Sequence, residues 1–317
     1  MVRRWEILQG DVRETLRALP EKTVQTCVTS PPYFGLRDYG VDGQIGLEPT
    51  PAEYVEQMVQ VFREVRRVLR DDGTLWLNLG DSYTGSANNG GEASKTMQGT
   101  QAATGKNLPS KSGAGLKPKD LIGIPWRVAF ALQADGWYLR QDIIWHKPNP
   151  MPESVRDRCT KAHEYVFLLS KSERYFFDSE AMREPCSEDM QRRASKGHTR
   201  GAGGKIDASR QDADKLRGEH AKVIDVSNGR NRRSVWTVAT RPYKGAHFAT
   251  FPPALIEPCI LAGAPFNGLV LDPFTGSGTT AAVALQHGRR FIGCELNPDY
   301  IKLAEARIAA AEAEVLW

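Results

Sequence analysis

The stretch Cys27-Val28-Thr29-Ser30-Pro31-Pro32-Tyr33 organises the rest of the chain. β-Branched residues dominate positions 23–29 and favour a strand, and the two prolines end it because proline donates no backbone N–H to a ladder. The stretch therefore predicts a serine hydroxyl, a stiff backbone and an aromatic ring together at the end of a strand. Taken alone, it is equally consistent with an ordinary proline-rich turn.

A second stretch, Leu269-Val-Leu-Asp-Pro-Phe-Thr-Gly-Ser-Gly-Thr-Thr280, points to a binding site. Its apolar start predicts a buried strand that ends at Asp272, and its glycines predict a tight turn into a helix whose N-terminus faces a ligand. Glu295 ends the next predicted strand, a position from which an acid binds two ribose hydroxyls. The loop lacks a full G-x-G-x-x-G pattern, and Asp272 would repel a pyrophosphate. We therefore expect an adenosine that carries a cationic amino-acid group rather than NAD; an ordinary βα turn is the alternative.

Apolar periodicity alternates between strand and helix along the chain. Strands are predicted at residues 5–11, 23–30, 75–81, 137–145, 163–169, 269–271 and 290–295. A long helix is predicted from residue 51 to about residue 70, where Asp71-Asp72-Gly73 ends it. This alternation predicts an α/β fold with a doubly wound, mostly parallel, seven-stranded sheet.

The composition is that of a globular protein. The chain has 317 residues, of which 40% are apolar and 25% charged, which suits one large α/β domain with insertions. No apolar run is long enough for a membrane span, and residues 1–6 lack the apolar region of a signal peptide, so a cytoplasmic location is expected. The five cysteines lie far apart, which indicates reduced thiols and no zinc site.

Basic charge is concentrated in two polar segments. Residues 181–245 carry a formal charge of +7 and residues 82–119 carry +4, whereas the remainder of the chain carries −7. This distribution predicts a polyanionic partner. Residues 82–119 contain seven glycines and are predicted to form a long mobile loop. We expect residues 1–180 and 246–317 to form the α/β fold, with residues 181–245 as an insert.

The two stretches and Glu295 together resemble the S-adenosylmethionine-dependent DNA amino-methyltransferases, which methylate the exocyclic amine of cytosine or adenine. The Ser-Pro-Pro-Tyr stretch precedes the glycine-rich loop with the polar insert between them, an order similar to that of the β group of this family. The resemblance implies a Rossmann-like methyltransferase fold with a circularly permuted motif order. It also implies that residues 1–180 are the catalytic half, 181–245 the target-recognition insert and 246–317 the cofactor-binding half.

The resemblance assigns cofactor-binding positions residue by residue. It implies that Glu295 binds the ribose of S-adenosylmethionine and that Asp11 lies by the adenine. Phe248 and Phe251, in the segment before the glycine-rich loop, would close over the methionine moiety. The loop would hold the methionine end through Asp272, Pro273, Phe274, Gly276, Ser277 and Gly278.

The chemistry that the resemblance implies requires no metal and no covalent enzyme intermediate. The target base would be flipped out of the duplex, and Tyr33 would stack on it. The Ser30 hydroxyl and the Pro31 carbonyl would accept hydrogen bonds from the amine and align it for direct methyl transfer, with Pro32 stiffening the backbone. Because the two loops must then meet, the strands before Tyr33 and Asp272 are predicted to be neighbours.

Ser30 favours cytosine-N4 as the target, because family members that act on adenine mostly have Asp or Asn at this position; adenine-N6 is the alternative. An RNA or protein methyltransferase is a further alternative, and the intact Asp272, glycines and prolines disfavour an inactive binding protein. Double-stranded DNA is the expected partner, a cognate restriction endonuclease is a candidate partner, and a monomer or homodimer with no membrane association is expected. The candidate groove or phosphate contacts are Arg192, Arg193, Arg200, Arg230, Arg232 and Arg233.

Overall fold

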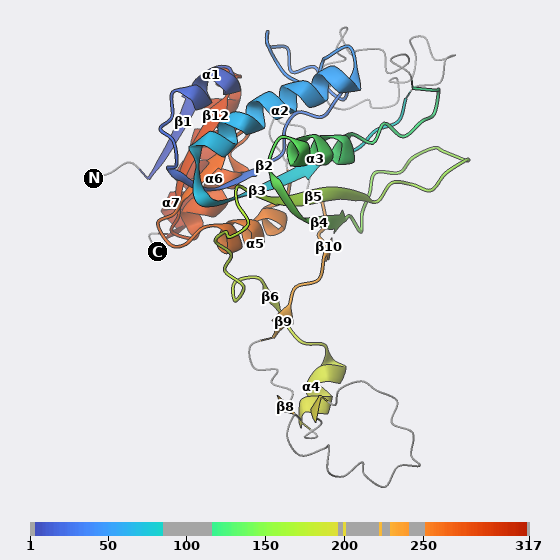
Figure 1. Cartoon of the computed structure of the whole chain (residues 1–317), viewed down its shortest axis with the longest axis vertical. Helices are drawn as coiled ribbons and strands as arrows, with labels where there is room; N and C mark the ends of the chain where they lie inside the picture. The colour runs from blue at the N-terminus through green and yellow to red at the C-terminus, as the bar shows by residue number, and fades with distance from the viewer. Residues whose placement is uncertain are drawn as a thin grey trace. The chain divides into compact units, whose positions relative to one another are not determined.

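A computed structural model shows an eight-stranded sheet with helices packed around it (Figure 1). It describes residues 4–84, 116–195, 199–200, 222–223, 229–240 and 251–315. The strands of this sheet are β1 (Trp5–Gln9), β2 (Val24–Thr29), β3 (Leu69–Leu79), β4 (Tyr138–His146), β5 (His163–Ser170), β10 (Val235–Thr237), β11 (Leu269–Asp272) and β12 (Arg290–Glu295). Their order is β1-β12-β11-β2-β3-β5-β4-β10.

All strands of this sheet run parallel except β5, which is antiparallel to both of its neighbours. The predicted α/β class and mostly parallel sheet are therefore confirmed. Over the residues that the structure describes, this sheet has eight strands, one more than the seven predicted. The extra strand, β10, has three residues, and its pairing with β4 is a long-range contact that no periodicity could indicate.

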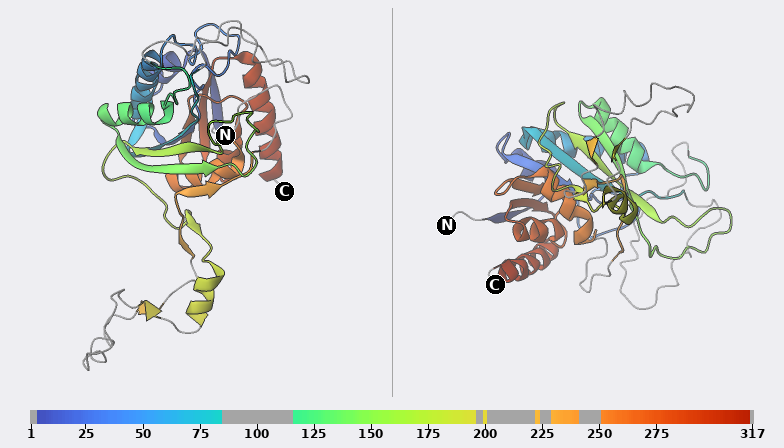
Figure 2. Two further views of the ribbon diagram at one scale, coloured as in Figure 1. Left: turned by 90° about the vertical axis from the view of Figure 1, so that its right-hand side faces the viewer. Right: turned by 90° about the horizontal axis from the view of Figure 1, so that it is seen from below.

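Helices cover both faces of the sheet (Figure 2). The helices α1 (Val12–Arg17), α2 (Pro51–Val68) and α3 (Ile124–Ala134) share one apolar core with Leu75 and Leu77 of β3. On the other face lie α5 (Pro253–Gly263), α6 (Thr279–Gln286) and α7 (Pro298–Val315). Gly263 of α5 packs closely on Trp76, whose side chain points away from those of Leu75 and Leu77 because strand side chains alternate. The sheet is therefore doubly wound.

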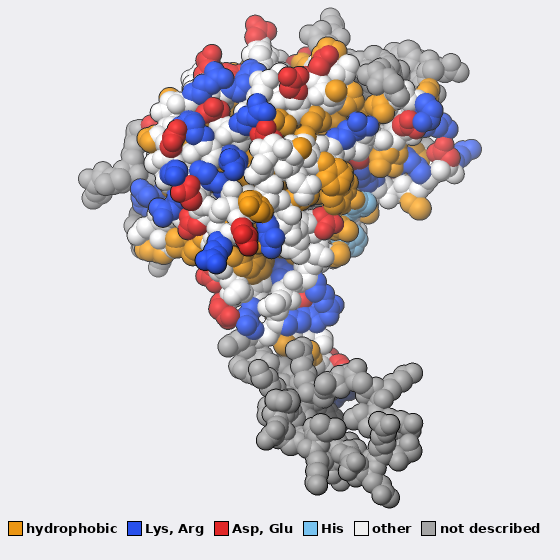
Figure 3. Space-filling model, viewed as in Figure 1, with side chains coloured by type: hydrophobic (Ala, Val, Ile, Leu, Met, Phe, Trp, Pro, Cys, Tyr) orange, Lys and Arg blue, Asp and Glu red, His pale blue; other side chains and the backbone are white. Residues whose placement is uncertain are grey.

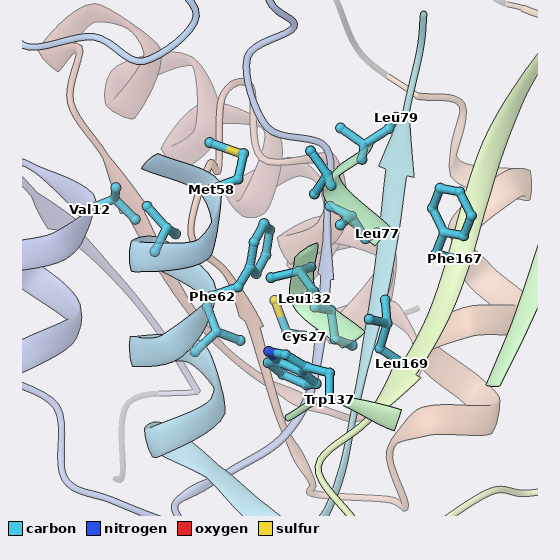
Figure 4. Close-up of a cluster of buried hydrophobic side chains, with 14 of the residues drawn as sticks. Val12, Cys27, Met58, Phe62, Leu77, Leu79, Leu132, Trp137, Phe167 and Leu169 are labelled. Atoms are coloured by element: carbon cyan, nitrogen blue, oxygen red, sulfur yellow. The ribbon is translucent and has the colours of Figure 1, made fainter. Parts of the chain in front are cut away.

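The helix α2 covers the strand that leads to Ser30. It begins where the Thr50 hydroxyl accepts a hydrogen bond from the Glu53 amide (3.2 Å), with Pro51 in its first turn. Met58 and Phe62 project from α2 into the buried apolar cluster that also contains Cys27 of β2 (Figure 4). All three are fully buried. The side of β2 that faces α2 is therefore covered by apolar side chains close to Ser30.

The boundary between α2 and β3 differs from the prediction. The helix ends at Val68, and β3 begins at once at Leu69 and runs through Asp71-Asp72-Gly73, where the sequence predicts a helix stop. Leu69 pairs with Val24 of β2, and the register then shifts before Thr26. Pairing across the sheet thus overrides the local turn signal.

The chain divides into two compact units, Met1–Asp178 with Ser234–Trp317, and Ser179–Arg233. The second unit contains β6 (Arg183–Glu184), α4 (Glu188–Ser195), β7 (Thr199–Arg200), β8 (Lys222–Val223) and β9 (Arg230–Asn231). It is shorter than the predicted insert, residues 181–245, because β10 joins the main sheet. Residues 85–115 of the predicted loop lie outside the described residues. Within the described ranges, no helix is both long and apolar enough to cross a membrane.

Candidate functional site

The two stretches that the sequence singles out meet in the structure. Strands β2 and β11 pair in parallel, with Leu271 opposite Cys27. The Thr29 hydroxyl donates a hydrogen bond to the Asp272 carboxylate (2.7 Å), although the two residues are 243 positions apart. The prediction that these strands are neighbours is therefore confirmed.

A cavity of about 670 Å³ opens at this edge of the sheet, a volume typical of small-molecule sites. Its lining includes the four residues of the Ser-Pro-Pro-Tyr stretch, most of the glycine-rich loop, and acidic side chains from two further strand ends. The predicted site residues that line it are Asp11, Ser30, Pro31, Pro32, Tyr33, Phe251, Asp272, Pro273, Phe274, Gly276, Ser277 and Glu295. Phe248 lies outside the described residues.

Asp272 ties three segments together. Its Oδ1 accepts hydrogen bonds from the Thr29 hydroxyl (2.7 Å) and the Phe274 amide (3.0 Å), and its Oδ2 accepts one from the Thr280 hydroxyl (2.6 Å). A carboxylate offers about four acceptor positions, so one remains for a group in the cavity. The side chain is 2% exposed, and this burial raises the pKa of Asp272 to about 6. A cation bound in the cavity would favour the ionised form.

Glu295 lies at the end of β12 with both carboxylate oxygens directed by backbone amides. The Gly276 amide donates to Oε2 (2.8 Å) and the Asn297 amide donates to Oε1 (2.9 Å). Burial raises the pKa of Glu295. Each oxygen retains acceptor capacity, which suits two adjacent hydroxyls of a ribose. Together with Asp272, this set of acceptor groups fits a nucleoside that carries a cationic group.

Gly278 is not among the residues that line the cavity, and its role as a cofactor contact stays a prediction. It precedes α6 with φ +76°, and a Cβ there would lie 2.9 Å from the Cα of Ala304 in α7. Only glycine accommodates both the backbone angle and this close approach. Gly278 therefore serves the packing of α6 on α7. The neighbouring Ser277 hydroxyl accepts a hydrogen bond from Arg307 of α7 (3.1 Å).

Asp11 has a structural role in addition to its place in the cavity wall. Its Oδ1 accepts from the Arg13 amide (2.8 Å) and so caps α1. Its Oδ2 forms an ion pair with the Arg13 guanidinium (2.7 Å), and this hydrogen-bonded pair lowers the pKa of Asp11. The predicted position of Asp11 by an adenine stays a prediction.

Tyr33 is held from two sides. Its ring lies against Gly80, where a Cβ would come within 2.5 Å of Tyr33 Cε2. Its hydroxyl donates to Glu164 Oε2 (2.7 Å) and accepts from the Ser30 hydroxyl (3.4 Å). Burial and the nearby Glu164 carboxylate raise the pKa of Tyr33 well above its usual value. The ring therefore presents a fixed face to the cavity.

The backbone of the Ser-Pro-Pro-Tyr stretch is also fixed. The Tyr54 hydroxyl of α2 donates a hydrogen bond to the Pro32 carbonyl (2.8 Å), and Tyr54 is fully buried. Pro31 is buried as well. Proline φ angles cannot relax, so the Pro31 carbonyl keeps its direction.

Asn78, Lys147 and Glu164 are among the cavity-lining residues that were not predicted. Asn78 lies near the end of β3 and Lys147 directly follows β4, so the rule that parallel sheets bind ligands at their carboxyl ends could have identified both. Glu164 stands near the start of β5. It could be found only by knowing that β5 runs against its neighbours.

The arginine candidates differ in their surroundings. Arg230 is half-buried and pairs with Glu184 (2.9 Å) across the β6–β9 ladder, so its guanidinium is used within the smaller unit. Arg192 is exposed and pairs with Asp189 in α4 (2.7 Å). Arg232 and Arg233 follow β9, and Arg233 is exposed. The side chains of Arg193 and Arg200 lie outside the described residues.

Comparison with known proteins identifies the family. A family model described as DNA methylase matches residues 24–306. The Type II methyltransferase M.Cfr9I of Citrobacter freundii is 47% identical over 98% of this chain and 89% of its own length, and M.SmaI of Serratia marcescens is 46% identical over 97% and 91%. In fold, the chain resembles the PvuII DNA methyltransferase, which is cytosine-N4-specific (TM-score 0.61, 19% identity, 98% and 92% of the two chains). The chain therefore belongs to the S-adenosylmethionine-dependent DNA amino-methyltransferases.

Proposed function

We propose that this protein is a site-specific methyltransferase that modifies the N4 amine of cytosine in double-stranded DNA; adenine-N6 is the alternative. The observation that supports it is the position of Ser30, which lines the same cavity as Asp272 and Glu295 and is held by the Tyr33 hydroxyl. The site thus combines a place for a cationic nucleoside with an acceptor for an amine.

In this proposal the cavity is shared between cofactor and base. When bound, S-adenosylmethionine supplies an electrophilic methyl group on a sulfonium. Glu295 accepts hydrogen bonds from its ribose hydroxyls, and Asp272 offers its remaining acceptor position to the cationic amino-acid group. Phe251, 9% exposed, and Phe274 contribute apolar surface to the same wall.

The Ser-Pro-Pro-Tyr stretch orients the amine. The Ser30 hydroxyl and the Pro31 carbonyl accept hydrogen bonds from its two N–H groups, which directs the nitrogen lone pair toward the methyl group. Once methylated, the amine releases its surplus proton to solvent. The Tyr33 ring stacks on the flipped base and offsets part of the cost of unstacking it, a few kcal/mol. Reacting atoms must lie about 3–3.5 Å apart, so catalysis depends mainly on alignment. The rigid hold on Tyr33 and Pro32 serves this alignment.

Identification of the methylated base tests the proposal. Purified protein is incubated with isotopically labelled S-adenosylmethionine and duplex DNA, and the nucleosides are separated by mass spectrometry. We expect labelled N4-methylcytosine. Labelled N6-methyladenine would overturn the cytosine assignment, and label in RNA but not in duplex DNA would overturn the choice of nucleic acid.

Replacing Glu295 by Gln should weaken S-adenosylmethionine binding by about 10-fold or more, because the charged acceptor for the ribose hydroxyls is lost and one of its two oxygens becomes an NH2 donor. Calorimetry measures the affinity. The control ligand is an analogue of S-adenosylmethionine without the two ribose hydroxyls, which should bind wild type and Glu295→Gln with equal affinity. If the variant weakens both ligands by the same factor, Glu295 does not bind the ribose.

The smaller unit is proposed to supply part of the DNA affinity through Arg232 and Arg233. Replacing both by Ala should make the log-log salt slope of DNA binding shallower by about 1.8, at about 0.9 per phosphate contact. Arg230 is left intact because its removal would break the pair with Glu184. Fluorescence anisotropy against salt concentration measures the slope, and the affinity for S-adenosylmethionine should not change.

The control for this experiment is the double variant Arg63→Ala/Arg70→Ala, which removes two exposed arginines from α2 and β3. Figure 3 shows Lys and Arg interspersed with Asp and Glu on the described surface in that view. Removing two positive charges anywhere on this surface should weaken the attraction to DNA, and the control measures that general effect. An equal change of slope in the control and in Arg232→Ala/Arg233→Ala would refute a specific role for the latter pair.

A further inference from the structure

A row of hydrogen-bonding groups runs from Ser30 across three neighbouring strands to Lys147. Ser30 donates to the Tyr33 oxygen (3.4 Å), and Tyr33 donates to Glu164 Oε2 on β5 (2.7 Å). The other oxygen of Glu164 forms an ion pair with the Lys147 ammonium just after β4. Asn78 of β3 donates to Glu164 Oε2 (3.2 Å). The side chains of Glu164 and Lys147 are 15% and 19% exposed.

The orientation of Asn78 follows from its neighbours. Its Nδ2 donates to the Tyr165 carbonyl (3.0 Å), an oxygen that can only accept, so the amide oxygen faces the Tyr33 hydroxyl (3.2 Å). Tyr33 therefore meets two acceptors, Asn78 Oδ1 and the Glu164 carboxylate. It has one proton, and the shorter, charge-assisted contact to Glu164 takes it.

The direction of the remaining hydrogen bond is then determined. With its own proton on the Glu164 side, the Tyr33 oxygen can only accept from Ser30. The pKa of Tyr33 is raised well above its usual value by burial and by Glu164, so this hydroxyl stays protonated. The Lys147 ammonium pairs with the Glu164 carboxylate and so stabilises the charged acceptor of the Tyr33 proton. The same ammonium lies 4.4 Å from the centre of the Trp145 ring.

We propose that Glu164 is a positioning residue for methyl transfer: through Tyr33 it turns the Ser30 proton away from the cavity, so that Ser30 presents its lone pairs to the target amine. This inference rests on the proposed function. Without Glu164, the Ser30 and Tyr33 protons are free to point into the cavity, where they compete with the hydrogens of the amine. The effect falls on the transfer step and not on cofactor binding.

The test compares Glu164→Gln and Tyr33→Phe with wild type in single-turnover methyl transfer at saturating S-adenosylmethionine and duplex DNA. Each substitution should slow transfer by about 10-fold, the effect of one charge-assisted hydrogen bond. The affinity for S-adenosylmethionine, measured by calorimetry, should stay within about twofold of wild type because neither side chain contacts the Asp272 or Glu295 positions. That affinity also reports that the variants are folded.

A double-mutant cycle separates positioning from general damage. If Glu164 acts through the Ser30 hydroxyl, then Ser30→Ala/Glu164→Gln should transfer at the rate of Ser30→Ala alone. Full additivity of the two losses would overturn the inference, and so would a wild-type rate in Tyr33→Phe, which leaves the Glu164–Lys147 pair in place. The matched control is Glu64→Gln, a partly buried carboxylate paired with Arg67 on α2 (2.7 Å), which should transfer at the wild-type rate.

Failure of the inference is distinguishable from failure of the proposed function. Wild-type protein that transfers no label to duplex DNA refutes the function itself. Wild-type protein that labels duplex DNA, together with Glu164→Gln that does so equally fast, refutes only the role of Glu164.

Discussion

Replacing Asp272 by Asn should lower the affinity for S-adenosylmethionine by about 30-fold, the equivalent of about 2 kcal/mol for a lost hydrogen bond to a charged group. The Asn side chain has nearly the same shape and can still meet Thr29, Thr280 and the Phe274 amide, because hydroxyl groups rotate to donate or accept. What it cannot supply is the negative charge. Calorimetry measures the loss, and Asp135→Asn, whose carboxylate pairs with Arg63 at a distance of 2.5 Å, is the control.

The same carboxylate predicts a pH dependence. Burial raises the pKa of Asp272 to about 6, so the unliganded protein loses this negative charge as the pH falls through 6. We expect wild-type affinity for S-adenosylmethionine to decrease below pH 6 and the affinity of Asp272→Asn to be insensitive to pH in that range. A parallel decrease in both proteins would show that another group is responsible.

Asp272→Asn should lower cofactor affinity but should not lower the folding stability of the unliganded protein at pH 7. A carboxyl group whose pKa is higher in the folded state contributes stability that is fully present below the unfolded value, 3.8, and is lost as the pH rises through about 6. At pH 7 the wild-type protein therefore carries the cost of a buried charge, which the Asn variant lacks. Thermal unfolding without cofactor should show Asp272→Asn to be at least as stable as wild type. An unfolded variant at pH 7 would mean that the hydrogen bonds to Asp272 contribute more to stability than burial of its charge costs.

Replacing Ser30 by Ala should reduce kcat by about 100-fold, the scale seen when one preorganised hydrogen-bonding group is removed from an active site. The Ala side chain leaves the Pro31 carbonyl as the remaining acceptor of this stretch for the amine, so the amine is less well aligned. Cofactor affinity should be unchanged within about twofold, since Ser30 lies outside the Asp272 and Glu295 contacts. Steady-state kinetics with duplex DNA and calorimetry with S-adenosylmethionine measure the two quantities.

The adjacent residue provides the contrast. Thr29 is buried and donates to Asp272, so Thr29→Val should affect cofactor affinity more than kcat. Thr29 is the last residue of β2 and Ser30 directly follows it, yet the two substitutions should have different effects: Thr29→Val on cofactor affinity and Ser30→Ala on kcat. If Ser30→Ala turns over at the wild-type rate under saturating conditions, the Ser-Pro-Pro-Tyr stretch is not the catalytic element.

Local patterns predicted much of the fold because they reflect local physics. The β-branched residues before Ser30, the prolines after it and the apolar run before Asp272 each specify a strand and its end through backbone geometry. Boundaries were less predictable: Leu69 belongs to β3 because of its partner Val24, which lies 45 positions away. Strand β10 was missed for the same reason, since three residues carry no periodicity.

Sequence patterns alone predicted the fold class and placed Ser30 and Asp272 at strand ends, because backbone geometry and apolar periodicity are local properties. The resemblance to the methyltransferases then implied that β2 and β11 are neighbours, since their two loops must meet for methyl transfer. The contacts that individual side chains make are known only from the folded structure. In the folded structure Gly278 packs against α7, and Arg230 pairs with Glu184. Glu164 accepts a hydrogen bond from the Tyr33 hydroxyl. These outcomes depend on contacts between segments far apart in the chain, and on the reversed direction of β5, which no local pattern of residues encodes.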